Sequence, residues 1–284
     1  MAMRVSPMRR RLIALAGALS LGLGALAGAA APAQAEKLRL GNEGVFPPFS
    51  MVGSDGVLKG VEPDLAREMC KRMNVECELM AMDFKALIPS ILQGKFDILI
   101  SQLIPTPERR ERLTLSRRLF TNPSTFVVPV NSQYTFTKEG LRGKGIKLAL
   151  QRGAATTKWA QERFGDAIEY SLYDNPDQEK LDLLAGRVNM LFQLKINATI
   201  ELISKPEGKG WKLDGGEFDV GQDDIPEASR GLVWAVRKGD DALVKRMNTA
   251  LDSIFADCTI TTIRKKYLDL TTSPEDAACV AKGM

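Results

Sequence analysis

The sequence contains no histidine, and this absence excludes several kinds of chemistry. Histidine is the commonest metal ligand and the usual general base near neutral pH, and the 284 residues contain none. The four cysteines include no CxxC pair, so the spacing of a structural zinc site is also missing. No Walker P-loop and no serine-based triad can be recognised. We therefore expect no metal, no cofactor and no enzymatic activity.

An excess of positive charge is also missing once the N-terminal segment is set aside. The whole chain has 39 Lys and Arg against 35 Asp and Glu. Residues 1–35 hold four of the arginines and no acid, which leaves 35 basic and 35 acidic residues in 36–284. A net charge near zero gives no basic surface for phosphates, so nucleic acid is not an expected partner.

The one long apolar run lies near the N-terminus. Arginines precede an apolar stretch from Leu12 to Ala27, and Ala33-Gln34-Ala35 forms an A-x-A cleavage site. This arrangement predicts a cleavable export signal over residues 1–35, by the general or the twin-arginine route, with the mature chain beginning at Glu36. A transmembrane anchor is the alternative, but the stretch is shorter than the ~20 residues that a spanning helix needs. We expect a periplasmic monomer.

The four cysteines are expected to pair, because an exported chain meets an oxidising compartment. Cys70 and Cys77 would join the end of a helix to the strand that follows it. Cys258 and Cys279 would then attach the C-terminal tail to the last helix. A short loop such as the first stabilises a fold by roughly 2–3 kcal/mol in the chain-entropy view.

Strands and helices alternate along the chain in two successive β-α-β-α-β units. The first unit is predicted over 37–41, 63–73, 76–80, 86–93 and 96–101. The second is predicted over 146–150, 156–164, 168–173, 178–185 and 188–193, and a further strand (231–237) and helix (241–255) follow. Two such units favour an α/β protein of two lobes with parallel sheets. If the chain then returns to the first lobe, two connections run between the lobes and form a two-strand hinge. We assign 36–122 and 229–284, which includes the C-terminal tail, to lobe 1 and 123–228 to lobe 2.

A series of specific motifs lies at the ends of these elements. They are Asn42–Phe49, Gly60–Leu65, Asp83–Ser90, Phe96–Ser101, Pro105–Arg109, Gly186–Val188 and Lys265–Tyr267. The ordered series resembles the polar amino-acid family of periplasmic substrate-binding proteins of ABC importers, above all the lysine/arginine/ornithine and histidine binders. The resemblance covers essentially all of residues 37–270. It implies the type II periplasmic binding protein fold, a solute held between the lobes, and an inner-membrane ABC permease as partner. It also implies the small disulfide loop of those binders at Cys70 and Cys77.

For the first lobe, the resemblance implies specific ligand contacts. Arg109 matches the arginine that clamps the ligand's α-carboxylate, for which a planar group with several donors is suited. Phe46 and Phe84 match two aromatic residues that enclose the ligand side chain. Glu43 matches an acid that meets a distal cation in the binders of basic amino acids. The alternatives from the residues alone are a solvated surface arginine, core phenylalanines and a carboxylate in a surface turn.

Other predicted contacts come from the ends of strands in both lobes. Ser101 matches a hydroxyl that touches the ligand, and Gln102 follows it. In the second lobe, Gly153 and Thr156 are expected to offer backbone amide and hydroxyl groups. The family usually has a glycine followed by Ser or Thr in this turn, whereas here the hydroxyls have moved to Thr156 and Thr157, and Ala155 is a further candidate contact.

Two positions depart further from the family pattern. Ile104 replaces a typical Ser or Thr, and Leu194 replaces the Asp that would pair with the ligand's α-ammonium. Lys195 would repel a cation there, and burial of an unpartnered ammonium costs several kcal/mol.

Two explanations remain for the missing acid. An acid such as Asp174, Asp177 or Glu179 could substitute for it. Alternatively, the ligand is not a simple α-amino acid but a carboxylate or another anion that uses Arg109, with Lys195 as a second candidate contact. We favour the second explanation.

The sequence thus predicts a periplasmic protein that captures a small carboxylate-bearing solute, an amino acid or a similar compound, for an ABC importer. Two alternatives use the same fold. One is a ligand-poor protein that binds a periplasmic partner or presents itself to a sensor. The other is a periplasmic dehydratase of the cyclohexadienyl type, with Glu43 or Asp174 as a lone acid.

Overall fold

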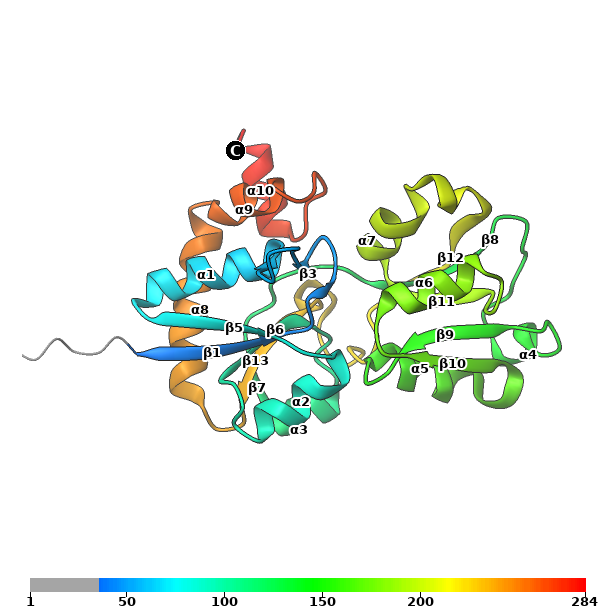
Figure 1. The fold of residues 1–284 in the computed structure, drawn as a ribbon, viewed down its shortest axis with the longest axis horizontal. Coiled ribbons are helices and arrows are strands. Elements are labelled where there is room, and N and C mark those ends of the chain that lie inside the picture. Colours follow the sequence, from blue (N-terminus) through cyan, green and yellow to red (C-terminus); the bar gives the residue numbers. More distant parts are fainter. Residues whose placement is uncertain (1–35) are drawn as a thin grey trace, which may run out of the picture. The chain divides into compact units, whose positions relative to one another are not determined.

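The computed structural model describes residues 36–284, so the predicted export signal over 1–35 lies outside the described part of the chain. Two five-stranded sheets form the centres of two α/β lobes (Figure 1). The first sheet has the order β5-β1-β6-β13-β7 and comprises β1 (Lys37–Asn42), β5 (Glu76–Ala81), β6 (Ile98–Leu103), β7 (Leu113–Leu115) and β13 (Val233–Arg237). The second has the order β10-β9-β11-β8-β12 and comprises β8 (Ser124–Pro129), β9 (Lys147–Gln151), β10 (Glu169–Tyr173), β11 (Met190–Leu194) and β12 (Trp211–Phe218).

Helices and a small sheet surround these strands. The small sheet comprises β2 (Val45–Phe46), β3 (Ser50–Val52) and β4 (Leu58–Lys59). The α-helices are α1 (Val61–Met73), α2 (Phe84–Leu92), α3 (Pro107–Arg112), α4 (Lys138–Leu141), α5 (Ala155–Phe164), α6 (Pro176–Leu184), α7 (Lys195–Ala198), α8 (Asp241–Ala256), α9 (Thr259–Lys265) and α10 (Pro274–Ala281). The elements expected from the sequence all occur, with ends that differ by a few residues.

The expectation of wholly parallel sheets was wrong. In the first sheet β1 runs parallel to β5 and β6, but β13 is antiparallel to both β6 and β7. In the second sheet β9 runs parallel to β10 and β11, whereas β8 is antiparallel to β11 and β12. The parallel strands belong to the local β-α-β units, which require a crossover. The antiparallel strands β8 and β13 are the first strands after each passage between the lobes.

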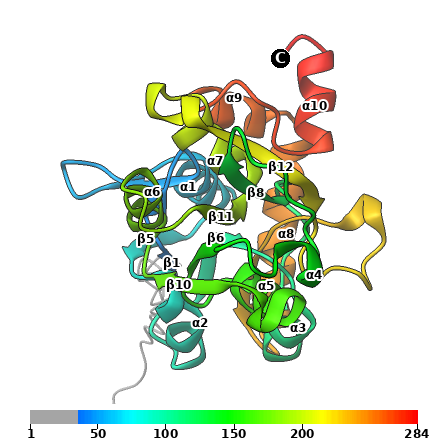
Figure 2. The ribbon, with the colours of Figure 1, turned by 90° about the vertical axis from the view of Figure 1, so that its right-hand side faces the viewer.

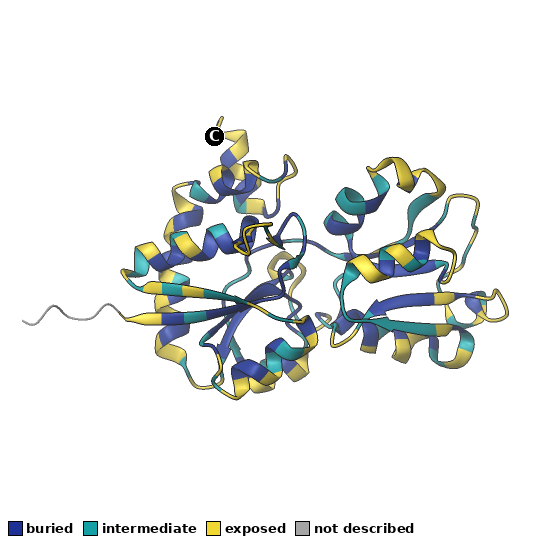
Figure 3. Cartoon of the chain, viewed as in Figure 1, coloured by how far each residue is buried: buried dark blue, intermediate teal, exposed yellow. Residues whose placement is uncertain are grey.

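Alternating side chains along the strands bury both faces of each sheet. In β9, Leu148 and Leu150 pack with Phe164 of α5, whereas Ala149 between them packs with Leu183 of α6. Successive side chains of a strand point to opposite faces, so α5 and α6 cover opposite faces of the second sheet (Figure 1). The first sheet is covered in the same way by α1 on one face and α2 on the other. The central strands β6, β8, β9, β11 and β13 are accordingly mostly buried, whereas β5, β10 and β12, at the edges of the sheets, are intermediate or exposed (Figure 3).

Two segments connect the sheets, one between β7 and β8 and one between β12 and β13. They meet in a single antiparallel bridge between Phe120 and Leu232, in which the backbone amide of Leu232 donates to the carbonyl of Phe120 at 2.8 Å. The two connections are therefore paired at one point, as a two-strand hinge requires. The lobe boundaries predicted at 122/123 and 228/229 fall within these connections and stay a prediction.

Both expected disulfides are present. Cys70–Cys77 joins the end of α1 to β5, and Cys258–Cys279 joins the segment before α9 to α10. Helices α9 and α10 lie side by side at one end of the first lobe (Figures 1 and 2). Within residues 36–284, no helix is both long and apolar enough to cross a bilayer, and no three acidic, cysteine or histidine side chains are grouped to hold a metal.

Candidate functional site

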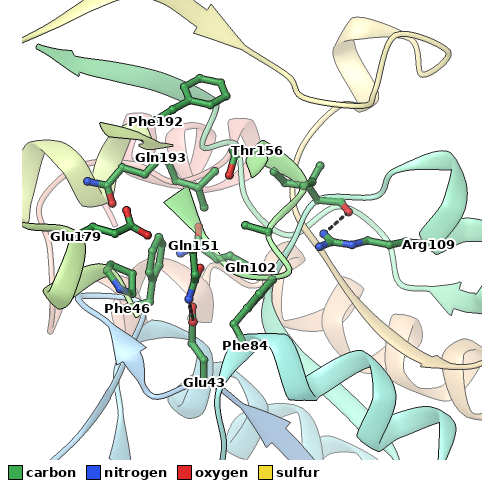
Figure 4. Close-up of a pocket in the computed structure, with 15 residues that line it drawn as sticks. Glu43, Phe46, Phe84, Gln102, Arg109, Gln151, Thr156, Glu179, Phe192 and Gln193 are labelled. Carbon is green, nitrogen blue, oxygen red and sulfur yellow. Dashed lines mark hydrogen bonds between the residues drawn. The ribbon is translucent and has the colours of Figure 1, made fainter. Parts of the chain in front are cut away.

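A pocket lies where strand ends and helix starts of the two lobes face each other (Figure 4). Ligand sites in α/β sheets commonly form at the carboxyl ends of the strands, and β1, β6, β9 and β11 end at or next to this pocket. Its lining residues are Glu43, Phe46, Phe84, Gln102, Ile104, Arg109, Gln151, Ala154, Ala155, Thr156, Pro176, Glu179, Phe192, Gln193 and Leu194.

Arg109 is the buried cation of the pocket, with a relative exposure of 7%. Arg109 lies in the first turn of α3, which begins with a proline. The backbone amide of Arg109 donates to the hydroxyl of Thr106 at 3.4 Å, and this bond caps the helix. Its guanidinium donates from Nη1 to the carbonyl of Ile104 at 3.0 Å and from Nη2 to that of Gly153 at 2.9 Å. No carboxylate among residues 36–284 forms an ion pair with it, although a guanidinium carries five donors. Burial lowers the pKa of Arg109 to about 10, so it stays charged at neutral pH.

Two buried acids complete the charged part of the pocket. Glu43 follows β1 and accepts a hydrogen bond from Nε2 of Gln151, in the other lobe, at 2.8 Å. Burial raises the pKa of Glu43 to about 7. Glu179 lies in the first turns of α6, is 2% exposed, and its Oε1 has no hydrogen-bond partner within residues 36–284. Burial, with a contribution from the charge of Glu43, raises the pKa of Glu179 to about 8.

Neutral polar groups are also left without partners here. The Gln102 amide accepts from Asn122 Nδ2 at 3.0 Å, but its own Nε2 has no partner among the described residues. The same holds for the Ser101 hydroxyl, one residue earlier in β6. Buried polar atoms are normally paired. Of these atoms, Gln102 Nε2 and Glu179 Oε1 belong to residues that line the pocket, which indicates that a bound molecule completes their hydrogen bonds.

Hydrogen bonds join the two lobes around the pocket. Besides the contacts of Arg109 and Glu43, Asn197 donates from Nδ2 to the carbonyl of Pro47 at 2.8 Å, and Lys85 pairs with Asp174 at 2.8 Å. Gly153 has a φ of +79°, and a Cβ at this position would lie 3.1 Å from Cα of Lys85. The backbones of the two lobes therefore approach each other closely beside Arg109.

Comparison with known proteins identifies the family. Residues 38–270 match the bacterial extracellular solute-binding proteins, family 3. The chain belongs to this family.

Several amino-acid-binding proteins resemble the chain over nearly their whole length. The histidine-binding periplasmic protein of Escherichia coli is 30% identical over 263 residues, which are 92% of this chain and 98% of the relative. An ancestral arginine-binding protein bound to arginine matches with a TM-score of 0.71 and 29% identity, over 82% of this chain and 98% of the other. The ancestral amino acid-binding protein AncCDT-1, a precursor of cyclohexadienyl dehydratase, matches with a TM-score of 0.68 and 25% identity, over 82% and 95%. These matches confirm the type II periplasmic binding protein fold.

Most of the residues predicted from the sequence line the pocket of this family 3 protein. They are Glu43, Phe46, Phe84, Gln102, Ile104, Arg109, Ala155, Thr156 and Leu194. Three others do not line it. Ser101 is buried in β6, Gly153 contributes its carbonyl to Arg109, and Lys195 pairs with Glu217 at a half-exposed position. Their direct contact with a ligand stays a prediction.

The structure also distinguishes the three acids that could replace the Asp missing at position 194. Asp174 is occupied by Lys85 and Arg152, Asp177 is exposed beside Lys180, and only Glu179 of the three lines the pocket. Lining residues that the sequence reasoning did not assign are Gln151, Ala154, Pro176, Phe192 and Gln193. Gln151 ends β9 and Gln193 lies at the end of β11, so the rule that ligands meet strand ends would have indicated both.

Proposed function

We propose that this protein captures a small carboxylate-bearing solute, an amino acid or a similar compound, in the periplasm and delivers it as a monomer to an inner-membrane ABC permease. Membership of the family of extracellular solute-binding proteins and the similarity to histidine- and arginine-binding proteins support this function. The observation that carries it is the buried guanidinium of Arg109, which lines the pocket with no acid paired to it among residues 36–284.

A carboxylate is the ligand that such a group accepts best. The Arg109 guanidinium is planar and holds its charge, and a carboxylate can take two parallel hydrogen bonds from it. The first turn of α5 begins at Ala155, so the free backbone amides of its start offer further donors to an anion. Phe46 and Phe84 give the pocket apolar surface for the carbon chain of the solute.

The test is a thermal-shift screen and titration calorimetry over amino acids, opines, dicarboxylates, betaines and aromatic acids. A solute at 100 times its Kd adds about 2.7 kcal/mol to the free energy of unfolding. Arg109→Ala is expected to weaken binding of that solute at least about 100-fold, because charged hydrogen bonds are worth about 1.5–3 kcal/mol each.

Arg112→Ala is the matched control. Arg112 lies on the same helix with half of its side chain exposed, and it does not line the pocket. The control should bind the solute as the unchanged protein does. Equal affinity in Arg109→Ala would refute the carboxylate clamp.

A second candidate function is a dehydratase. The similarity to AncCDT-1, together with two buried carboxyl groups whose pKa values lie near neutral, favours this alternative over other enzyme classes. A carboxyl that holds its proton near pH 7 can act as a general acid. Incubation with prephenate or arogenate decides between the two functions, since a binding protein returns either compound unchanged.

A further inference from the structure

Of the two acids that line the pocket, Glu179 has the less satisfied carboxyl group. It is 2% exposed, it lines the cavity, and its Oε1 has no hydrogen-bond donor within residues 36–284. The neighbouring Lys180 is not its partner, because that side chain pairs with Asp177 and lies 4.0 Å from Glu201. A buried carboxyl in this state lacks the donors that it would have in water.

The acids and the arginine occupy different sides of the pocket. In Figure 4 the guanidinium of Arg109 lies on one side, Glu179 lies on the opposite side, and Glu43 approaches from below between them. Glu43 and Glu179 come from different lobes, and both line this pocket. Because both acids lie away from Arg109 in Figure 4, they are placed to face a positive group of a bound molecule.

The part of the pocket next to Arg109 has no acidic side chain like Glu43 or Glu179. The guanidinium of Arg109 donates to the carbonyls of Ile104 and Gly153. The pocket-lining residues at or next to these two positions are Ile104, Ala154 and Ala155, and their side chains are all apolar. Leu194 lines the pocket as well and cannot accept a hydrogen bond from its side chain. An ammonium placed directly beside a carboxylate on Arg109 would thus meet no acid.

We propose that Glu179, together with Glu43, binds a cationic group at the far end of the ligand from Arg109. The ligand is then a carboxylate with a guanidinium or ammonium at the distal end of an aliphatic chain, and it needs no ammonium beside its carboxylate. This inference rests on the proposed function, because it takes the carboxylate on Arg109 as given. Phe46, which lines the same pocket, would offer an aromatic face to the cationic end.

Titration calorimetry with three compounds of equal chain length can measure how much each of the two cationic groups of the ligand contributes to binding. Arginine carries both, 5-guanidinopentanoate carries only the distal one, and norvaline carries only the one beside the carboxylate. We expect 5-guanidinopentanoate to bind within about tenfold of arginine and norvaline to bind at least about 100-fold more weakly. If arginine binds more than 100-fold more tightly than 5-guanidinopentanoate, or if norvaline equals arginine, the inference is wrong.

Glu179→Gln tests the residue itself with a side chain of nearly equal shape. We expect it to weaken binding of 5-guanidinopentanoate by about 30-fold or more, and to leave the weak binding of pentanoate, which has no cation, within threefold. Glu169→Gln, which removes an exposed acid of the same lobe, is the matched control and should change neither affinity. Equal affinity for the guanidino compound in Glu179→Gln would overturn the role of Glu179.

The outcomes also separate this inference from the function on which it rests. If carboxylates bind and Arg109→Ala abolishes their binding, but the distal cation makes no difference, only the inference fails. If none of the compounds binds and no other carboxylate of the screen does, the proposed function fails with it. The series on the unchanged protein does not depend on the folding of any variant.

Discussion

Three buried glutamates distinguish this protein at the level of single residues, and they are not equivalent. Glu62 is 1% exposed and accepts a hydrogen bond from the indole of Trp234 at 2.9 Å, and Glu43 accepts one from Gln151. Glu179 has an oxygen without any partner in the described chain. An unsatisfied buried polar group destabilises a fold by about 1–3 kcal/mol. A residue retained at that cost is typical of a site where stability is exchanged for function.

The stability of the ligand-free protein is expected to depend on pH through Glu179. Its pKa is about 8 in the fold and near its ordinary value of 4.5 when unfolded, so between these values the folded state holds a proton that the unfolded state has lost. The free energy of unfolding should therefore fall as pH rises through this window, by up to about 1.4 kcal/mol per pH unit from this group.

Glu179→Gln removes this dependence. Urea unfolding at pH 5, 6, 7 and 8 should show the stability of the variant, relative to the unchanged protein, increasing steadily with pH. A difference that stays constant over the range would mean that Glu179 is solvated and has an ordinary pKa.

Leu194 and Lys195 illustrate how far the sequence can predict a site. They are adjacent, but Leu194 ends β11 and Lys195 begins α7. Leu194 lines the pocket, and Lys195 pairs outside it with Glu217. The sequence indicated that both stand near the ligand, but it could not decide which one faces inward. That choice depends on the register of β11 against β8 and β9, which only the tertiary fold determines.

The position of Glu179 in α6 leaves a signal in the sequence. Glu179 and Leu183 are four residues apart and are the two buried residues of α6. Residues at this spacing share a helix face, so an acid on the face marked by Leu183 was a visible departure from an apolar pattern. The sequence did not, however, show whether this face of α6 meets a core or a cavity.

At the level of elements, the predicted units are correct where contacts are local. The β-α-β units were identified because their apolar periods are short and uninterrupted. The strands β8 and β12 were not assigned, and they pair with each other across more than 80 residues of chain. Their pairing depends on the hinge that brings the chain into the second lobe, so no local pattern in 124–129 or 211–218 specifies it.

The C-terminal helix depends on a buried ion pair. Arg264 of α9 donates from Nε to Oδ2 of Asp276 in α10 at 3.0 Å, and both side chains are at most 1% exposed. Asp276 also accepts from the hydroxyl of Thr261 at 2.7 Å and from the backbone amide of Thr272 at 2.9 Å. Removal of one partner from such a pair leaves a buried charge and costs about 3–5 kcal/mol.

Asp276→Ala is therefore expected to lower the free energy of unfolding by about 3–5 kcal/mol and to leave solute affinity unchanged, because α10 is remote from the residues that line the pocket. Chemical unfolding with the disulfides intact measures the first quantity and calorimetry the second. Asp252→Ala, which removes an exposed partner of Arg117, is the matched control and should cost less than about 1 kcal/mol. A loss of affinity in Asp276→Ala would show that the C-terminal segment acts on the pocket.

At the level of the whole molecule, ligand capture requires that the two lobes meet. The exposed pair Lys85–Asp174 contributes little to this contact, because ion pairs in water are worth about 0–1 kcal/mol. The buried bonds are better placed to hold the lobes together. Asn197 reaches the carbonyl of Pro47, and its Oδ1 accepts from Asn122, which lies in the connection between β7 and β8. One chain of amide groups thus links the second lobe, the hinge and the first lobe.

Gly153 is where the approach of the lobes can be tested. A Cβ there would lie 3.1 Å from Cα of Lys85, a backbone atom of the other lobe that cannot rotate away. Gly153→Val should therefore hold the lobes apart beside Arg109 and weaken solute binding at least about tenfold, which corresponds to about 1.4 kcal/mol. A larger radius of gyration with saturating solute, measured by small-angle X-ray scattering, should accompany the loss.

Gly143→Val separates this effect from backbone strain. Gly143 has a φ of +72°, close to that of Gly153, but a Cβ there has no atom within 4 Å. Both variants carry the strain of a branched residue in the left-handed region, about 1–3 kcal/mol, so both should lose stability. Only Gly153→Val should lose affinity. If the two variants bind the solute equally well, contact between the backbones at Gly153 and Lys85 is not needed for capture, and the ligand is held while the lobes stay further apart.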